Sequence, residues 1–491
     1  MADNSLNQAI ETLLTELGGG KTEPSAYETA WVARLAPRYP QFSDSLDWLR
    51  QNQHDDGTWG AKHHFFHDRF ISTLAAVVAL QELGNGYRDE RRIKRGVAAL
   101  WHLIGHLHSD ANDTVGFPLL ALSLGEEAEN MGLHVPRPPL RHRDSYYRKM
   151  NVLLKNPDRN WRGTTLTFSL EGMRSAFKDG DDLFETNGSI SISPAATAAY
   201  LMAHHHEGGL RYLETLRQAG RGGGIPALAP IDVFEIVWSL NHLRLAGAIT
   251  SDHPVVQQIL AYLWGRWSPE RGICLATHFP VPDVDDTAAA YTLLRWGSYS
   301  PNAGAFAFFE VGDHFVTFHG ETDPSLSANA RLLATLLESD DPEIDHRWVD
   351  KLTKFLREQD VTGSFWWDKW HASPYYVSGF SLPALSGFDD NLARSRLNWM
   401  LNTQRDDGGW GYLGSSSPEE TAYCLEALLF WRERVELIDI AQIDEAAGYL
   451  YDHLYDLEHP ALWINKGLYT PTYPVKAAVL SALFAYERHK S

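Results

Sequence analysis

The sequence has little cysteine and no long apolar run. Its 491 residues include only Cys274 and Cys424, too few for a disulfide framework, which fits a reducing compartment. No stretch approaches the roughly 18 consecutive apolar residues of a membrane span. The first twenty residues lack the features of a secretory signal or of an organelle transit peptide. We therefore expect a cytoplasmic protein without stable membrane insertion; the sequence leaves its oligomeric state open.

Positive charge is also scarce. The chain has 43 Lys and Arg against 63 Asp and Glu, a formal net charge of −20. This balance, without any block of like charges, argues against a nucleic acid or an anionic membrane as partner. Glycine-rich phosphate loops of the P-loop or dinucleotide type are absent from the sequence. An anionic ligand would need local basic side chains or a divalent cation at its site.

What the chain has instead is helical periodicity. Apolar residues recur at three- and four-residue spacing, as in FISTLAAVVALQEL and AYCLEALLFWRERVEL, while alternating patterns are rare. This pattern predicts an all-α protein. The length exceeds one ordinary domain, and 44% hydrophobic residues suffice for two cores. The loop at 17–25 and the glycine-rich stretch at 219–226 are the expected breaks.

An aromatic residue followed by an apolar one recurs through the second half of the chain. Successive starts are 44 to 50 residues apart, which corresponds to one helix, turn, helix and loop. The pattern predicts six helical hairpins that close a ring. Weaker copies at Trp48 and Trp101 indicate a second helical domain. Five starts are aromatic–apolar pairs, at Tyr212, Tyr262, Phe355, Trp399 and Tyr449, and Phe309 falls in the gap between the second and the third as the sixth start.

Two segments share a more detailed pattern. Gln53, Asp56, Gly57 and Trp59 follow Trp48-Leu49, as Gln404, Asp407, Gly408 and Trp410 follow Trp399-Met400. In these Gln-Trp motifs the Gln side chain can bond free backbone groups at a helix end while Trp covers the turn. Gly permits the chain to reverse. We interpret both motifs as structural clamps without a catalytic role.

Three carboxylates, Asp283, Asp285 and Asp286, precede the helix-like run AAAYTLLRW. Such a group commonly caps a helix and complements its dipole. Inside an apolar ring, however, the carboxylates cannot all ionise, so one keeps its proton. An alkene is a very weak base and requires a water-shielded acid of this kind. The motif therefore predicts either a helix cap or a general acid that protonates an alkene.

The run Asp283-Val284-Asp285-Asp286 resembles the DxDD motif of class II terpene cyclases, which include squalene-hopene cyclases and labdane-type diterpene cyclases. Nearly the whole chain resembles the diterpene branch. The resemblance implies two (α/α) barrels in the family's βγ arrangement: a γ domain at 25–225, a β domain at 226–491, and an N-terminal helix within 1–24 that joins the β domain. The blocks that carry it are SAYETAWVA, TTLTFSLEGM, SPAATAAYLM, GIPALAPIDVFEIVW and FVTFHGETDPSLSANARLL.

The resemblance also implies roles for single residues. Asp285 is the expected general acid, with Asp283 and Asp286 tuning and reprotonating it. Asn329 matches a family Asn that hydrogen-bonds this acid, and Lys369 matches a basic residue that contacts the diphosphate. The expected reaction is an isomerisation, in which geranylgeranyl diphosphate forms two rings and keeps its diphosphate. A class I terpene synthase or a phosphatase is the expected downstream partner.

The family often recruits magnesium through an acidic cluster before a GFP-like segment. Here Asp110 and Asp113 precede Gly116-Phe117-Pro118, but Ser109 stands where an acid is common. These two aspartates are candidate Mg²⁺ ligands, with solvated loop carboxylates as the alternative. Histidines also cluster, but no matched cysteine or carboxylate set surrounds them, so we expect structural or solvated side chains. The clusters are His63, His64 and His67; His102, His106 and His108; and His204, His205 and His206.

Two positions bear on the product. In the plant branch that makes ent-copalyl diphosphate, a His and an Asn orient the water that removes the final proton; this chain resembles that branch but has Phe168 and Ala227 there. Neither can act as a base, and a cation that keeps its proton can rearrange over aromatic faces. The leading prediction is a clerodane such as kolavenyl diphosphate. Alternatives are copalyl diphosphate made with another base, drimenyl diphosphate from farnesyl diphosphate, and a non-catalytic helical-ring binding module.

Overall fold

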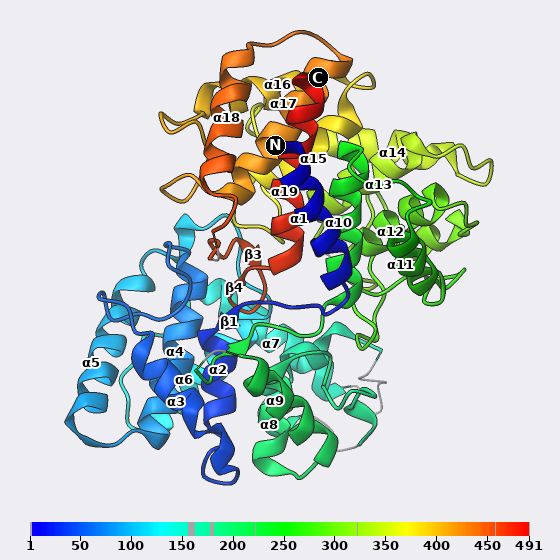
Figure 1. Ribbon diagram of the computed structural model, residues 1–491. Coiled ribbons are helices and arrows are strands. Elements are labelled where there is room, and N and C mark those ends of the chain that lie inside the picture. The colour runs from blue at the N-terminus through cyan, green and yellow to red at the C-terminus, as the bar shows by residue number, and fades with distance from the viewer. Residues whose placement is uncertain are drawn as a thin grey trace.

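Helices dominate the protein in the computed structural model, as Figure 1 shows. The structure describes residues 2–155, 163–176, 181–220, 222–321, 323–456 and 458–490. Within these ranges the strands are two residues long and form two antiparallel pairs. β1 (Pro24–Ser25) pairs with β2 (Ile225–Pro226), and β3 (Trp463–Ile464) pairs with β4 (Leu468–Tyr469). The all-α prediction is confirmed.

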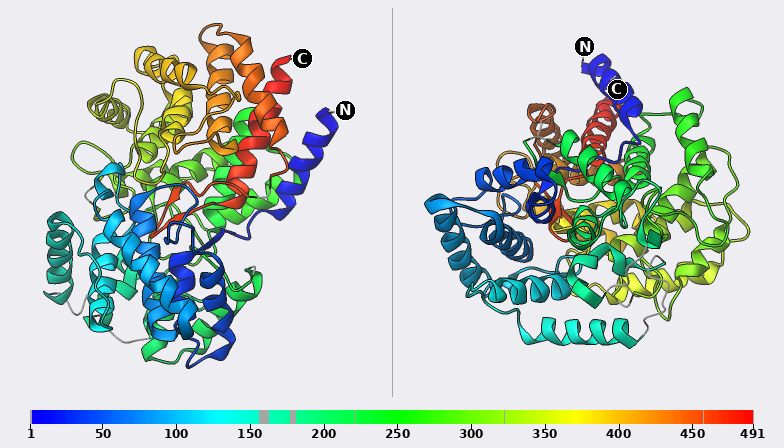
Figure 2. Two further views of the ribbon diagram at one scale, coloured as in Figure 1. Left: turned by 90° about the vertical axis from the view of Figure 1, so that its left-hand side faces the viewer. Right: turned by 90° about the horizontal axis from the view of Figure 1, so that it is seen from below.

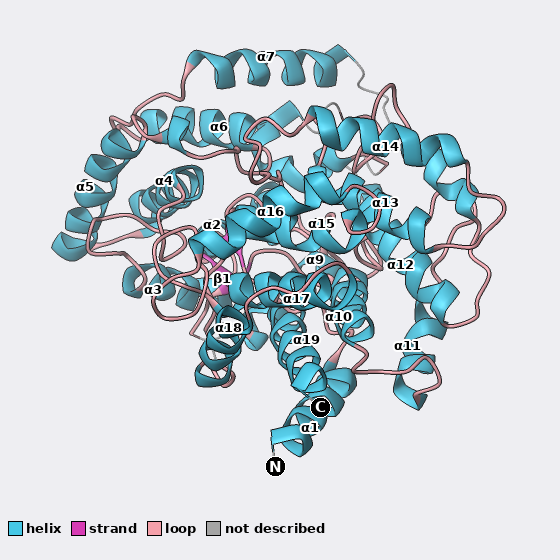
Figure 3. Ribbon diagram, turned by 90° about the horizontal axis from the view of Figure 1, so that it is seen from above, coloured by secondary structure: helices cyan, strands magenta, loops and turns pink. Residues whose placement is uncertain are grey.

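Six of the described helices close a ring through their successive contacts. This ring occupies the upper half of Figure 1 and is seen from above in Figure 3. Each helix packs on the next in the order α10, α12, α13, α15, α17 and α19, and α19 returns to α10. Outer elements cover them, with α1 on α19, α11 and η5 on α12, α14 on α13, α16 on α15, and α18 on α17. The ring helices are α10 (Asp232–Ala246), α12 (Val284–Trp296), α13 (Leu326–Glu338), α15 (Pro374–Leu385), α17 (Pro418–Arg434) and α19 (Thr472–Lys490). The outer elements are α1 (Ala2–Glu16), α11 (Pro254–Trp264), the 3₁₀ helix η5 (Ala303–Phe309), α14 (His346–Glu358), α16 (Asp390–Thr403) and α18 (Ile440–Asp452).

Polar caps set where the ring helices begin. The side chains of Ser325, Ser373 and Ser417 accept hydrogen bonds from backbone N–H groups in the first turns of α13, α15 and α17. These bonds satisfy donors that a helix start leaves free. Pro374 and Pro418 each follow a cap, at a position where the missing N–H costs nothing. The sequence thereby starts several ring helices with the same chemistry.

The remaining helices build a second core in the lower half of Figure 1. Helix α2 packs on α4 and α8, and α4 packs on α5 and α6. Figure 2 shows the two halves from the side, with both chain termini beside the ring, where α1 packs on α19. The elements of this half are α2 (Ala26–Ala33), η1 (Pro40–Phe42), α3 (Ser43–Gln51), α4 (Phe66–Leu83), α5 (Gly86–Leu103), η2 (Leu107–Ser109), α6 (Phe117–Asn130), α7 (Leu140–Lys155), η3 (Thr165–Ala176), η4 (Asp181–Leu183), α8 (Pro194–Ala203) and α9 (Glu207–Ala219).

One of the predicted hairpin starts is wrong. Tyr212 lies in α9, which packs on α8 in the second core, and its hydroxyl donates to the carbonyls of Ile192 and Ala229. The ring closes instead through α19 and α10, with α1 outside. An aromatic–apolar pair marks a buried helix face but does not say which core buries it. The predicted domain boundaries at 24/25 and 225/226 fall within β1 and β2, which pair with each other. The division into two domains at these boundaries stays a prediction.

Within the described ranges, no helix combines the length and the apolar character needed to cross a membrane.

Candidate active site

The three carboxyls of the acid motif lie buried at the start of ring helix α12. Asp283 is the N-cap, and its Oδ1 accepts the backbone N–H of Asp286 at 2.7 Å. Asp285 and Asp286 occupy the first turn and are 6% and 3% exposed. The cap that the sequence allowed as an alternative is therefore real. It accounts for Asp283 and leaves the other two carboxyls for another role.

Burial favours the protonated form of these groups. It raises the pKa of Asp285 to about 6 and that of Asp283 to about 7. Burial raises the pKa of Asp286 well above its usual range, and the adjacent Asp283 charge adds to the effect. Asp283 and Asp286 are therefore electrostatically coupled, and burial favours the protonated form of both.

Arg331, on α13, is the direct partner of Asp285. Its Nε donates to Asp285 Oδ1 at 2.7 Å. The guanidinium lies 4.1 Å from the ring centroid of Trp238 and 4.2 Å from that of Phe380. This cation stabilises the ionised carboxylate and so partly opposes the effect of burial on the Asp285 pKa. An acid whose conjugate base is stabilised in this way releases its proton more readily.

The predicted contact of Asn329 with Asp285 is wrong in this structure. Asn329 Oδ1 accepts from the backbone N–H of Phe315 at 2.9 Å, and its Nδ2 donates to the carbonyls of Phe315 and Ser325. The two bonds to Phe315 fasten the loop that crosses the start of α12, where Thr317 O accepts the Val284 N–H, and the bond to Ser325 stays within the start of α13. Asn329 therefore positions the backbone beside the acid motif, and Arg331 makes the contact that was expected of it.

Lys369 lies on a loop near the same end of the ring. Its Nζ donates to Glu321 Oε2 and to the Asp323 carbonyl, both at 2.7 Å. The neighbouring Asp368 is buried and accepts from Ser325 Oγ and from the Ser327 N–H, which fixes this loop to the start of α13. A diphosphate at Lys369 has to displace Glu321, and the binding role of Lys369 stays a prediction.

The structure brings Phe168 and Ala227 to the turn between β3 and β4. Lys466 Nζ lies 4.6 Å from the ring centroid of Phe168, and Asn465 Nδ2 donates to Ala227 O at 3.0 Å. Both residues are buried in the same core as the ring helices. Their predicted effect on the product is not tested by this arrangement.

Aromatic rings extend from the acid motif towards Phe168. The backbone of Phe318 bridges to that of Asp283, and its ring contacts Phe279 edge-on at 6.0 Å. Phe279 in turn meets Phe168 edge-on at 6.3 Å. Aromatic faces of this kind stabilise cations. These three rings therefore provide a cation-stabilising surface between the acid motif and the half of the molecule that contains the second core.

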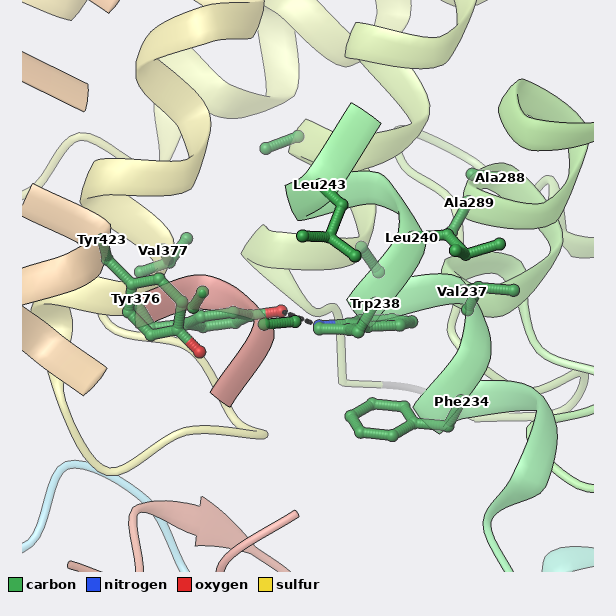
Figure 4. Packing of buried hydrophobic residues seen from close by; sticks show 14 of the residues in the cluster. Phe234, Val237, Trp238, Leu240, Leu243, Ala288, Ala289, Tyr376, Val377 and Tyr423 are labelled. Atoms are coloured by element: carbon green, nitrogen blue, oxygen red, sulfur yellow. Dashed lines mark hydrogen bonds between the residues drawn. The ribbon is translucent and has the colours of Figure 1, made fainter. Parts of the chain in front are cut away.

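A cavity of about 830 Å³ occupies the opposite end of the ring. It is lined by the later turns of the ring helices and extends to Arg331, Trp238 and Tyr376. Figure 4 shows the last two, joined by a hydrogen bond of 3.3 Å from Trp238 Nε1 to Tyr376 Oη. Solvent in this cavity can approach the Arg331 guanidinium, which is bonded to Asp285, from the end of the ring opposite the acid motif.

The two candidate magnesium ligands lie against histidines, and their binding of magnesium stays a prediction. Asp110 Oδ2 accepts both the backbone N–H and the Nδ1–H of His67, at 2.8 Å each. Asp113 lies between His67 and His142, with its two oxygens 3.0 and 2.9 Å from their Nε2 atoms. Magnesium prefers an octahedron of oxygen ligands, whereas this group offers imidazole nitrogens. The expectation that His67 lacks a carboxylate set is also wrong, because residues far apart in sequence supply it.

Comparisons with known proteins support a single family. The model of the squalene-hopene cyclase C-terminal domain matches residues 312–426. A type B diterpene cyclase of Mycobacterium tuberculosis is 37% identical over 97% of this chain and 98% of the relative. A chloroplastic (-)-kolavenyl diphosphate synthase of Tripterygium wilfordii is 32% identical over 75% of this chain, which is 46% of that protein. The structure of ent-copalyl diphosphate synthase from Streptomyces platensis matches with a TM-score of 0.84 and 25% identity over 99% of both chains.

Proposed function

Because the chain belongs to the class II diterpene cyclases, we propose that it converts geranylgeranyl diphosphate into a bicyclic diphosphate by protonation. The observation that carries this proposal is Asp285, a buried carboxyl with a raised pKa that is bonded to Arg331. Such an acid can hold a proton away from water and release it to an alkene.

The proposed reaction needs no other reactant. The Asp285 proton adds to the distal alkene, and each cation formed is attacked by the next π bond, so that two C–C bonds close two rings. A proton then leaves a carbon atom and passes to solvent. The C–O bond to the diphosphate stays intact, so substrate and product have the same formula and the enzyme is an isomerase. Because the product keeps its diphosphate, a later enzyme has to remove that group. A class I terpene synthase would do so by ionisation, and a phosphatase by hydrolysis.

Asp285 must recover its proton after each turnover. We propose that it comes through the cavity behind Arg331, which reaches Tyr376 and Trp238. Asp283 and Asp286 flank Asp285 at the start of α12 and supply a local proton reserve. This role matches the one that the family resemblance implies for the two outer aspartates.

For the product we propose a clerodane skeleton, with kolavenyl diphosphate as the leading candidate. Phe168 and Ala227 offer no base, and the aromatic surface of Phe168 and Phe279 favours a cation that persists and rearranges. Relatives named kolavenyl and ent-copalyl diphosphate synthases are similarly distant from this chain. A labdane such as copalyl diphosphate is the second candidate, and drimenyl diphosphate from farnesyl diphosphate is the third.

Incubation with geranylgeranyl diphosphate, followed by phosphatase treatment and product identification, tests the proposal. A bicyclic diterpene alcohol that is absent with Asp285→Asn supports it. Uncyclised geranylgeraniol from both proteins refutes the substrate; the same assay with farnesyl diphosphate then distinguishes a drimane cyclase from a non-catalytic module.

The double variant Phe168→His, Ala227→Asn tests the product proposal separately. Because it introduces a side-chain pair that can hold a water molecule as base, we expect a shift from a rearranged skeleton towards an unrearranged labdane. A clerodane fraction that is the same in this variant and in the wild type contradicts the role given to the two positions.

A further inference from the structure

Four side chains from three separate elements meet in the half of the molecule that contains the second core. His67 lies in the first turn of α4, Asp110 and Asp113 lie in the loop before α6, and His142 lies in the first turn of α7. Single donor atoms of His67, Asp113 and His142 all lie within 4.8 Å of one another. Both imidazoles are buried, with side chains 1% and 2% exposed, whereas Asp113 is 37% exposed.

Asp110 fixes which nitrogen of His67 faces the cluster. Because its carboxylate accepts from Nδ1 at 2.8 Å, Nδ1 carries a proton and the neutral ring presents a lone pair at Nε2. That buried Nε2 has no hydrogen-bond partner among the described residues, although Asp113 Oδ1 lies 3.0 Å away. A carboxylate behind a histidine in this way is a common support for metal-binding imidazoles.

His142 also places a ring nitrogen against the Asp113 carboxylate, on the side opposite His67. Arg141 Nε donates to the His142 Nε2 at 3.2 Å, so this atom acts as an acceptor while it lies 2.9 Å from Asp113 Oδ2. With both rings neutral, acceptor atoms of two imidazoles face the two oxygens of one carboxylate. A cation between them resolves the conflict, and a proton on His67 Nε2 is the alternative that the test has to exclude. Arg141 is a cationic side chain nearby, but it is 56% exposed and reaches Asp113 only at 3.8 Å.

The donors lie close to the spacing of a first-row transition-metal site. An ion about 2.0–2.1 Å from two donors at the tetrahedral angle holds them about 3.3–3.4 Å apart. The observed nitrogen–oxygen separations of 3.0 and 2.9 Å are shorter than this spacing, so a bound ion has to move the donors slightly apart. Two imidazoles and one carboxylate suit zinc and its neighbours, and the exposure of Asp113 leaves an entry path and a coordination position for water.

We propose that His67, His142 and Asp113 bind a zinc-class divalent cation, with Asp110 orienting His67. The site does not depend on the cyclisation chemistry. It assigns Asp110 and Asp113, the candidate magnesium ligands of the family resemblance, to a different ion. Its effect is to fix the loop that also contacts the ring half. In that loop Asn112 Nδ2 donates to the Asp368 carbonyl at 2.9 Å, and the Val115 N–H donates to Asn465 O at 2.9 Å.

The test uses full-length protein stripped with a chelator and then titrated with Co²⁺ and with Zn²⁺. We expect about one retained ion per chain, a visible Co²⁺ absorption band that Zn²⁺ abolishes, and a higher Tm with Zn²⁺. His142→Gln and Asp113→Asn abolish the band, and Asp110→Asn weakens binding about 10- to 100-fold. His102→Gln is the matched control, because His102 and His106 lie ring to ring at 4.7 Å without this carboxylate set.

Asp113→Asn changes a partly exposed residue, so it stays informative if His142→Gln does not fold. Retention of the band in both variants overturns the proposal, as does a folded wild-type protein that retains neither metal. The latter result assigns the cluster to protonated histidines. Displacement of Co²⁺ by equimolar Mg²⁺ also overturns the proposal, in favour of a magnesium site.

Discussion

At Asp285, two opposing effects act on one carboxyl. Burial raises its pKa to about 6, while the guanidinium of Arg331 favours the ionised form and limits the rise. Burial alone yields a carboxyl that holds its proton too firmly, and the cation alone yields one that is ionised at neutral pH. Together they keep an acid that is protonated just below neutrality and whose conjugate base is stabilised after transfer.

Replacement of Arg331 tests this balance through the pH profile. The reaction uses protonated Asp285, so kcat/KM falls as pH rises through the Asp285 pKa. In Arg331→Met burial acts unopposed, the pKa rises, and we expect the falling limb to move to higher pH by at least about one unit. The plateau kcat falls at least about tenfold, because the conjugate base has lost its counter-charge.

Arg331→Lys keeps a positive charge and is the control for this measurement. The falling limb of its kcat/KM profile should move less than that of Arg331→Met. Circular dichroism should show that both variants fold. An identical falling limb in the wild type and in Arg331→Met contradicts the assigned pairing.

At the scale of elements, the two Gln-Trp motifs make the same contacts in different halves of the molecule. Gln404 Nε2 donates to the carbonyls of Gly408 and Gln442, which joins the end of α16 to α18. Gln53 Nε2 likewise joins the end of α3 to α5, through the carbonyls of Gly57 and Arg92. Each motif thus clamps one hairpin to the next, as the sequence predicts.

Loss of one clamp should reduce stability without changing the chemistry. Gln404→Leu keeps the side-chain volume but leaves two partly buried carbonyls without their donor, so we expect a loss of about 1–3 kcal/mol in the free energy of unfolding. Gln53→Leu should cost a similar amount. The measurements are denaturant unfolding and kcat at denaturant concentrations below the unfolding transition. An unchanged free energy of unfolding together with a large fall in kcat would contradict the structural role of the motifs.

Helical periodicity, caps and the acid motif could be predicted because their signals lie within a few residues of one another. The side-chain partners could not. Arg331 lies within the apolar helix ANARLLATLL, and nothing local indicates that it faces Asp285. His67, Asp113 and His142 are likewise separated by tens of residues, so only packing of three elements shows them as one group. Family resemblance identified Asn329 as a site residue but placed its hydrogen bonds on the wrong partner.

At the scale of the whole molecule, a buried ion cluster connects the two halves. Lys466 follows β3 and is fully buried against the other half. Its Nζ lies 2.7 Å from Glu171 Oε1 and 2.5 Å from Ser193 Oγ, with Glu28 Oε1 at 3.6 Å. Burial raises the pKa of Glu28 to about 8, although Lys466 lowers it. The lysine therefore offsets part of the cost of burying these carboxyls where the two halves meet.

Lys466→Met should uncouple the two halves. It leaves Glu28 and Glu171 buried without their cation, which costs about 3–5 kcal/mol. Calorimetry should show a lower Tm, and adding Glu171→Gln should restore part of the loss. Lys62→Met is the control, because Lys62 pairs with Glu458 across the same two halves at an exposed site, where ion pairs contribute little. Equal effects of the two lysine substitutions contradict a structural role for the buried cluster.

The most direct test of protonation by Asp285 is the reaction of geranylgeranyl diphosphate in D₂O, with mass spectrometry and NMR of the intact product. Because the carboxyl exchanges its proton with solvent, we predict one deuterium per molecule, on the ring carbon derived from the protonated alkene, with the diphosphate retained. A bicyclic product without deuterium, or release of inorganic diphosphate during cyclisation, would contradict the account.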